Sequence, residues 1–148
     1  MKTDVIEIPI PAGHTATFDE RSGKITFKKK GNAMERIKTV ADVLADHGLT
    51  NEQFDKQCYG LDKDEVAYRI LKLLVKSLNE EWTADWNDDN QGKYSPWFYM
   101  GGSSGFRYDD FGNWNSSSRV GSRLCFKSSD LAKYAGTQFT EVFKQFML

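Results

Sequence analysis

The chain has 148 residues, of which 39% are hydrophobic and 28% are charged. This length and composition fit one globular domain and exclude wholesale disorder, low-complexity chains and collagen-like chains. The apolar stretches are far shorter than the roughly twenty residues of a membrane helix, so we expect no membrane partner.

The formal net charge of −1 hides a pattern along the chain. Residues 1–40 carry +3, residues 41–92 carry −7 and residues 93–148 carry +3. Dedicated nucleic-acid binders are usually strongly basic, so this balance argues against that class while leaving a local basic patch open. The N-terminus has no continuous apolar core and no cleavage site of small residues, which predicts a cytoplasmic protein. We expect Cys58 and Cys125 to be buried, reduced thiols.

The first thirty residues predict a small antiparallel sheet. Residues 5–10 alternate in polarity as a half-buried strand does, and Pro9 places that strand at an edge. Residues 15–18 and 24–29 follow as the two strands of a hairpin. Its apolar side chains are expected to reach the core: Phe18, Ile25 and Phe27.

Helices are predicted for the middle of the chain. Thr39 can cap a short helix that Gly48 ends. Two further starts have the spacing at which a cap residue and the residue three positions later satisfy each other's amides: Thr50 with Gln53, and Asp62 with Glu65. The second of these opens a long amphipathic helix from Lys63 to about Trp82.

Strands return in the C-terminal third. Residues 94–100 and 106–111 read as a hairpin around the glycine- and serine-rich loop 101–105, and residues 123–127 read as a third strand. Ser128 or Ser129 then caps a last helix, in which Gly136 permits close packing. One side of that helix is apolar: Ala135, Phe139, Val142, Phe143 and Phe146.

The predicted fold class is therefore α+β. An N-terminal β-hairpin or small antiparallel sheet precedes central helices, and a C-terminal antiparallel β-meander is followed by a helix. We expect a single domain over residues 1–148; the alternative is that residues 1–31 form a separate small sheet.

Several segments together resemble a family of small uncharacterised proteins from gut Bacteroidetes and their phages or prophages. The most specific is Trp82-Thr-Ala-Asp85-Trp86-Asn87 after a helix, followed by the strand ending in Phe126-Lys127-Ser128. Shorter matches are Ile25 to Lys30, Leu78-Asn79, Lys93-Tyr94 and Leu131-Ala132. The resemblance implies a setting on mobile elements and brings no activity, cofactor or catalytic residue.

Three short motifs resemble catalytic or metal-binding signatures but lack their context. Gly101-Gly-Ser-Ser-Gly105 matches a hydrolase nucleophile elbow, yet both histidines precede it and no helix follows. Asp110-Phe-Gly112 matches the kinase metal triplet without any other kinase element. Asp85, Asn87 and Asp89 have calcium-loop spacing, but the loop would have Asn90 at its glycine position and Pro96 at its glutamate position.

No metal or cofactor is predicted. The chain has two histidines, His14 and His47, and two cysteines, and none of them stands at zinc-ligand spacing. Several acidic residues occur as adjacent pairs, but neighbouring side chains on a helix or strand point apart.

Aromatic density is the most informative feature of the sequence. All four tryptophans and half of the twenty aromatic residues lie between Trp82 and Trp114. Alternation along strands puts Trp97 and Tyr99 on the face opposite to Phe98. Either the rings build the core of a sheet poor in aliphatic residues, or one set is exposed to a partner.

We therefore predict a non-enzymatic binding or interaction module that uses an aromatic-rich hairpin between Tyr94 and Arg119. The candidate binding residues are Trp97, Tyr99, Arg107, Tyr108, Trp114 and Arg119. The partner is unknown; a protein is favoured over single-stranded nucleic acid or carbohydrate.

Two alternatives remain open. One is single-stranded nucleic-acid binding through stacked aromatics and the basic run Lys28-Lys29-Lys30. The other is an enzyme whose carboxylate and arginine site shows no linear motif, with Asp85, Asp109 and Arg107 as candidates.

Overall fold

The computed structural model describes residues 7–11 and 13–148. The chain divides into two compact units, Met1–Asn32 and Ala33–Leu148. They are called the hairpin unit and the helical unit below, and each is described by itself. In the described part of the chain, no helix combines the length and the apolar character that crossing a bilayer requires.

The hairpin unit contains two antiparallel strands, β1 (His14–Asp19) and β2 (Lys24–Lys29), as the sequence predicts. Their pairing runs from His14 opposite Lys29 to Asp19 opposite Lys24. Asp19 builds the turn: its carboxylate accepts hydrogen bonds from the Arg21 amide (2.9 Å) and the Ser22 hydroxyl (2.7 Å). Gly23 completes the turn at a φ of 67°, which side chains with a Cβ disfavour.

Two predictions for this unit are wrong. The apolar residues expected in the core are exposed: Phe18, Ile25 and Phe27, of which Phe18 is 63% exposed. A two-stranded ribbon has no second layer of its own to cover an apolar face. In the expected strand at residues 5–10, residues 5 and 6 lie outside the described part, and residues 7–10 form no strand. Pro9 and Pro11 have no amide hydrogen to donate to a neighbouring strand.

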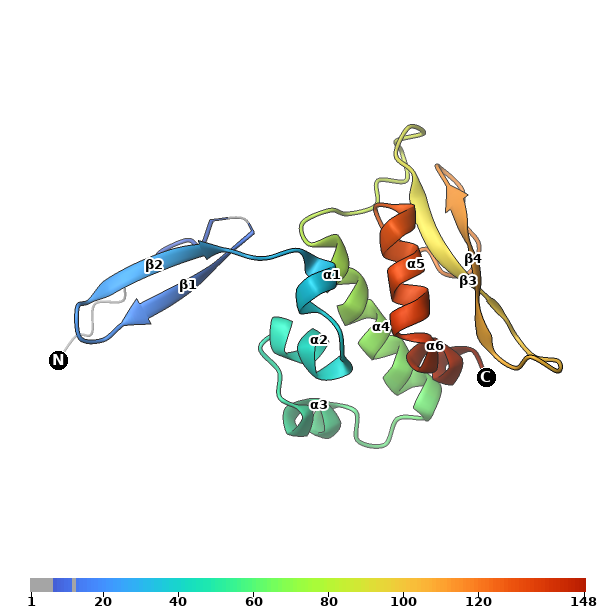
Figure 1. Ribbon diagram of the computed structural model, residues 1–148, viewed down its shortest axis with the longest axis horizontal. Helices are drawn as coiled ribbons and strands as arrows, with labels where there is room; N and C mark the ends of the chain where they lie inside the picture. Colours follow the sequence, from blue (N-terminus) through green and yellow to red (C-terminus); the bar gives the residue numbers. More distant parts are fainter. Residues whose placement is uncertain (1–6, 12) are drawn as a thin grey trace. The chain divides into compact units, whose positions relative to one another are not determined.

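Four helices open the helical unit: α1 (Ala33–Arg36), α2 (Val40–Asp46), α3 (Asn51–Gln57) and α4 (Lys63–Asn79) (Figure 1). The predicted start signals of α2 and α3 are confirmed, because the Thr39 hydroxyl accepts from the Asp42 amide and the Thr50 hydroxyl from the Gln53 amide. The α1 turn was not predicted.

The long helix α4 ends at Asn79, three residues before the predicted position. Glu80 takes a φ of 56° with a ψ of −117°, and this positive φ stops the helical repeat. The Glu80 amide still donates to the Lys76 carbonyl (2.9 Å), and the Trp82 amide donates to the Asn79 carbonyl (3.1 Å). These two bonds close the helix end and turn the chain into the loop that carries Trp82 and Trp86.

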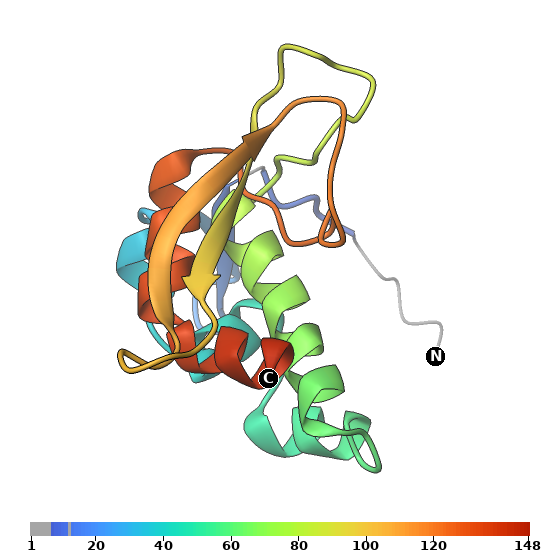
Figure 2. The same cartoon turned by 90° about the vertical axis from the view of Figure 1, so that its right-hand side faces the viewer.

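The second sheet pairs β3 (Lys93–Tyr99) with β4 (Arg107–Trp114) in antiparallel register. Between the pairs Pro96–Phe111 and Phe98–Tyr108, two steps along β3 match three along β4, so the sheet has a bulge there. Both strands pack against α5 (Ser129–Gln138), and Figure 2 shows the sheet in front of this helix.

The predicted third strand of the meander, residues 123–127, is reduced to one bridge. Phe126 pairs with Tyr94 through two backbone hydrogen bonds, of 2.9 and 2.7 Å. The backbone groups of the residues before and after Phe126 bond instead to the side chain of Asn79 in α4. This side chain donates to the Cys125 carbonyl (2.8 Å) and accepts from the Lys127 amide (3.0 Å). The segment therefore bonds to both a strand and a helix end.

The predicted last helix is two helices, α5 and α6 (Thr140–Met147), which meet at Phe139. The cap by Ser128 is confirmed, since its hydroxyl accepts from the Leu131 amide (3.3 Å). At the break, the Thr140 hydroxyl donates to the Gly136 carbonyl (2.7 Å), a bond that bends helices. After the break, α6 packs against α4.

The main core of the helical unit lies where α4, α5 and α6 meet the sheet. Its fully buried members include Leu71, Leu74, Leu78 and Phe126. A smaller cluster joins α2, α3 and α4. Cys58 and Cys125 are buried free thiols, as predicted.

Candidate functional site

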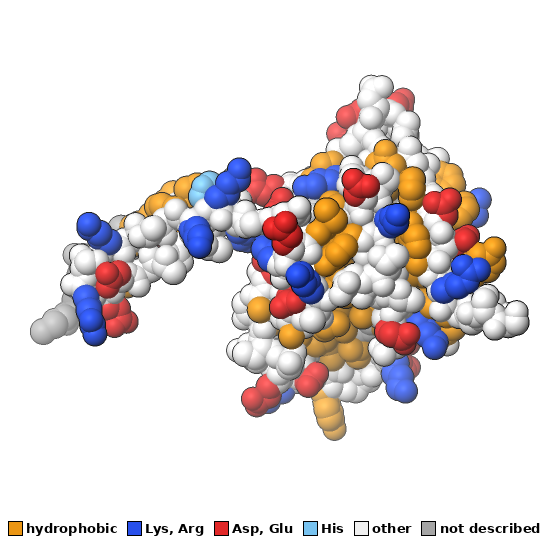
Figure 3. Space-filling model, in the orientation of Figure 1, with side chains coloured by type: hydrophobic (Ala, Val, Ile, Leu, Met, Phe, Trp, Pro, Cys, Tyr) orange, Lys and Arg blue, Asp and Glu red, His pale blue; other side chains and the backbone are white. Residues whose placement is uncertain are grey.

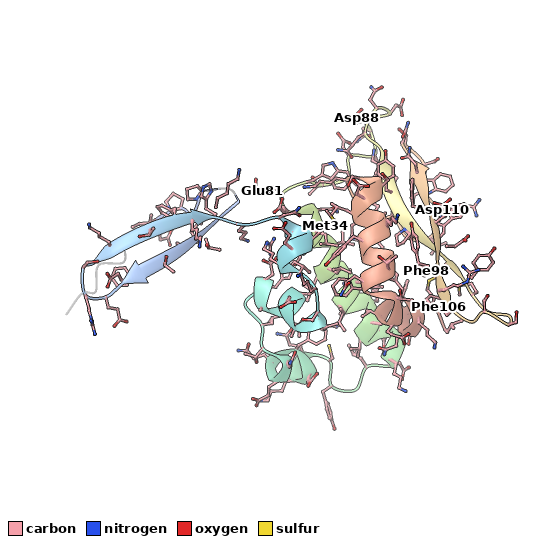
Figure 4. All side chains as sticks on the ribbon, viewed as in Figure 1. Met34, Glu81, Asp88, Phe98, Phe106 and Asp110 are labelled. Carbon is pink, nitrogen blue, oxygen red and sulfur yellow. The ribbon has the colours of Figure 1, made fainter. Side chains whose placement is uncertain are left out.

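The two sides of the β3–β4 sheet have different environments. Phe98 packs against Phe106, with ring centroids 4.9 Å apart, and against Phe143 of α6 at 4.8 Å. Figure 4 shows Phe98 and Phe106 together at one end of the sheet, with Asp88 in the loop at the other end. By contrast, Trp97 is 46% exposed and Tyr99 is 47% exposed, so rings in the predicted segment remain accessible.

Two arginines, one on β4 and one on the loop that follows it, lie over exposed or half-exposed aromatic rings of the sheet. The Arg107 guanidinium is 4.1 Å from the centre of the Tyr99 ring, its neighbour across the strands. The Arg119 guanidinium is 5.6 Å from the Trp114 ring. Both pairs have the geometry of a cation–π contact, which is stronger where water is excluded.

Gly112 brings two tryptophans together. A Cβ at this position would lie 2.7 Å from Nε1 of Trp97 and 3.2 Å from Nε1 of Trp114. The two indoles can approach the backbone of β4 this closely only because residue 112 has no side chain.

Trp97 and Trp114 line a cavity of about 280 Å³ between the sheet, the loop 118–121 and α6. We call it the tryptophan pocket. Most of its lining is apolar: Pro96, Phe98, Val120, Leu124, Phe143, Phe146 and Met147 join the two tryptophans. Arg119 is the only charged side chain among the lining residues in the described part of the chain.

The structure thus divides the six predicted binding residues. Trp97, Trp114 and Arg119 line the tryptophan pocket, whereas Tyr99 and Arg107 form a separate exposed pair. Tyr108 lies on the other side of the sheet against α5, and burial, followed by the nearby charges of the two aspartates at 109 and 110, raises the pKa of its hydroxyl. Figure 3 shows hydrophobic side chains interspersed with charged ones over this part of the helical unit.

The basic run lies in the hairpin unit. Lys28 and Lys29 pair with Thr15 and His14 in the β1–β2 ribbon, and the Lys30 amide donates to the Gly13 carbonyl (2.7 Å). Successive strand residues face opposite sides, so the run divides between the two faces of the ribbon.

Two of the carboxylates considered for catalysis or calcium binding, Asp85 and Asp89, take part in loop structure, as does the neighbouring Asp88. The Asp85 carboxylate accepts from the Asn87 amide (2.9 Å), and the Asp88 carboxylate accepts from the Asn90 amide (2.8 Å). Asp89 accepts a hydrogen bond from the Ser116 hydroxyl. Across residues 7–11 and 13–148, no three His, Cys, Asp or Glu side chains group as metal ligands would.

Sequence reasoning missed the α6 side of the tryptophan pocket. Phe146 and Met147 lie on a helix that periodicity predicts, but periodicity alone does not show which strand face the helix will meet. The contribution of Gly112 was missed for the same reason, because a glycine in a strand indicates close approach without naming the partner.

No family model, no curated protein sequence and no solved structure matches this chain. The resemblance to the Bacteroidetes proteins therefore stays a prediction.

Proposed function

We propose that this protein is a non-catalytic interaction module whose tryptophan pocket receives an apolar side chain of a partner protein, next to a carboxylate of that partner. The observation that carries the proposal is the pocket of about 280 Å³ with two tryptophans and one arginine in its lining. This volume is at the lower limit of small-molecule sites, about 300 Å³, and suits one or two side chains.

The residue types support a protein partner. Tryptophan, tyrosine and arginine are the residues that most often dominate binding energy at protein interfaces. Trp97 is accessible at the pocket, and the exposed Tyr99–Arg107 pair lies further along the same strands. Apolar anchors at the centre with charged groups around them are the usual arrangement of such interfaces.

The charge of Arg119 indicates which partner side chains would bind at the pocket. Arg119 is an unopposed cation in the described lining of the pocket, so a carboxylate beside the apolar group would gain an ionic contact. A nucleic-acid strand would require several cations along its backbone, and the pocket supplies one.

The proposed setting rests on the resemblance alone. It implies a protein of a phage, prophage or other mobile element.

Selection from a library of random displayed peptides tests the proposal. We expect the wild-type protein to enrich peptides that carry an aromatic or large aliphatic residue close to Asp or Glu. Trp97→Ser should abolish this enrichment, and Arg119→Gln should remove the preference for the acidic residue while retaining the apolar one.

Tyr59→Ser is the matched control, because Tyr59 is a highly exposed aromatic residue outside the pocket lining. It should select the same peptides as the wild type. If no motif is enriched, or if Trp97→Ser selects the wild-type motif, the proposed function is wrong.

A further inference from the structure

A second and larger cavity lies in the helical unit, along α4. Its volume is about 790 Å³, and it is bounded by α3, α4, the loop 82–86 and the segment 122–125. None of its lining residues belongs to the tryptophan pocket. We call it the basic groove, because its charged lining is Arg69, Lys72, Lys76, Arg123 and Glu80.

Three of the cations share one face of α4. Arg69, Lys72 and Lys76 stand three and four residues apart, the spacing that stacks side chains on one side of a helix, and all three are exposed. Arg123 adds a fourth cation from the segment that follows the sheet.

The side chains of these four cations are available to bind an anion. Over residues 7–11 and 13–148, none of them forms an ion pair or donates a side-chain hydrogen bond, although Lys72 lies 4.9 Å from the centre of the Tyr68 ring. Glu80, the one acidic side chain in the described lining, is within 3.8 Å of Arg36 and 3.6 Å of Lys127. The negative charge of Glu80 is therefore balanced by two cations that do not line the groove. The groove keeps a net positive charge.

Two half-buried tryptophans, Trp82 and Trp86, complete the groove. The Nζ of Lys93 lies 5.3 Å from the centre of the Trp86 ring and donates a hydrogen bond to the Asp88 carbonyl (3.1 Å). Lys93 is completely buried, and its side chain links the loop that carries Trp86 to the start of β3. The amide of Trp82 is bonded to the end of α4.

We propose that the basic groove binds single-stranded nucleic acid, with the four cations on the phosphates and with bases stacked on Trp82 and Trp86. Proteins that bind single strands combine a positive groove with aromatic side chains in this way. The volume is within the range of about 300–1,000 Å³ that is usual for ligand sites. A duplex would not serve, because its bases are already stacked on one another.

Binding of a fluorescein-labelled oligothymidine of about ten nucleotides, followed by fluorescence anisotropy, tests the proposal on the full chain. Four phosphate contacts predict that the logarithm of affinity falls with the logarithm of salt concentration at a slope of about −3. Raising salt from about 50 to about 200 mM should then weaken binding about fifty-fold.

Single substitutions in the groove should change this behaviour in defined ways. Lys72→Gln and Lys76→Gln should each reduce the steepness of the slope by about 0.7, because each removes one phosphate contact. Lys133→Gln on α5 is the control, since Lys133 is exposed outside the groove and should leave the slope unchanged. Trp86→Leu should weaken binding about tenfold, and the conservative Trp86→Phe should weaken it less.

Four results would overturn the proposal: no anisotropy change at low salt, equal binding of a duplex of the same length, equal effects of the Lys72 and Lys133 variants, or a Trp86→Leu variant that binds as the wild type. The last result would identify a site for polyanions in general. Trp97→Ser should leave the oligonucleotide affinity unchanged, which separates this site from the tryptophan pocket.

Discussion

The ring of Tyr108 lies directly against the backbone of Gly136. A Cβ at residue 136 would be 2.4 Å from Cδ2 of Tyr108 and 2.9 Å from the Cβ of Pro96, both far inside normal contact distance. The sheet carrying the exposed rings can therefore rest on α5 only because this helix has a glycine at the contact. Close packing at Gly136 was predicted from the sequence, and the structure identifies its partners.

Gly136→Ala should destabilise the protein. Alanine gains about 0.5–1 kcal/mol over glycine inside a helix. Overpacking of a tight contact costs about 1–3 kcal/mol, so the free energy of unfolding should fall by about 1–2 kcal/mol. Urea unfolding measures the change.

Gly121→Ala is the control for this substitution, because nothing lies within 4 Å of a Cβ at residue 121 and its φ is not positive. It should leave the unfolding free energy within about 0.5 kcal/mol of the wild type. A Gly136→Ala protein as stable as the wild type would show that sheet and helix are not in tight contact.

Asn79→Ala should be among the more destabilising substitutions. The Asn79 side chain is buried and bonds to both the Cys125 carbonyl and the Lys127 amide, which would lose their partner. Each unsatisfied buried group costs about 1–3 kcal/mol, so the expected loss is about 2–5 kcal/mol in urea unfolding.

Hydrogen exchange adds a local measurement, since the Lys127 amide should lose protection in the Asn79→Ala protein. Asn51→Ala, at an exposed position in α3, is the matched control and should change stability by no more than about 0.5 kcal/mol. Equal effects of the two variants would contradict the assigned role of Asn79.

Asp42→Asn should lower stability at neutral pH but not at strongly acidic pH. The Thr39 hydroxyl, followed by the backbone amides of Lys38 and Thr39, holds the pKa of the Asp42 carboxyl below its ordinary value. The stabilisation is therefore complete above the pKa of the unfolded carboxyl, about 3.9, and is lost as pH falls through the lower pKa of the folded state.

Unfolding free energies measured from pH 7 downward check this prediction. The gap between wild type and Asp42→Asn should stay constant above about pH 5 and close in acid. Asp55→Asn is the control, because the Asp55 carboxylate accepts no hydrogen bond from any residue that the structure describes. A gap that does not depend on pH would refute the contribution of Asp42.

Residues 33–148 should fold without the preceding residues. Every buried hydrophobic residue in the described part of the chain lies at or after Ala33, so the helical unit contains its own core. The truncated protein should keep the near-ultraviolet circular dichroism and unfolding midpoint of the full chain. Loss of cooperative unfolding on truncation would show that the two units are one folding domain.

Sequence patterns predicted the elements that depend on local interactions. The caps by Thr39, Thr50 and Ser128 follow from residue type and spacing, because a hydroxyl and an amide three residues apart meet within one turn. The two hairpins follow from alternation and turn residues in the same way. Such features need no knowledge of distant residues.

Two of the failures depended on distant residues. The third strand became one bridge because Asn79, nearly fifty residues earlier, takes the hydrogen bonds that flank Phe126. Phe18 was predicted in the core, but it is exposed. Alternation shows that a strand has an apolar face, but it does not show that a second layer covers that face.

The sequence by itself determined that the chain folds as α+β, where most helices begin and that its aromatic residues gather between Trp82 and Trp114. Only the tertiary structure decided which rings stay accessible, because that depends on where Gly112 and Gly136 let side chains and backbone approach. It also decided that the tryptophans divide between two cavities, one mostly apolar with a single arginine and one basic along α4. Local spacing cannot encode that division, since each cavity joins segments far apart in the chain.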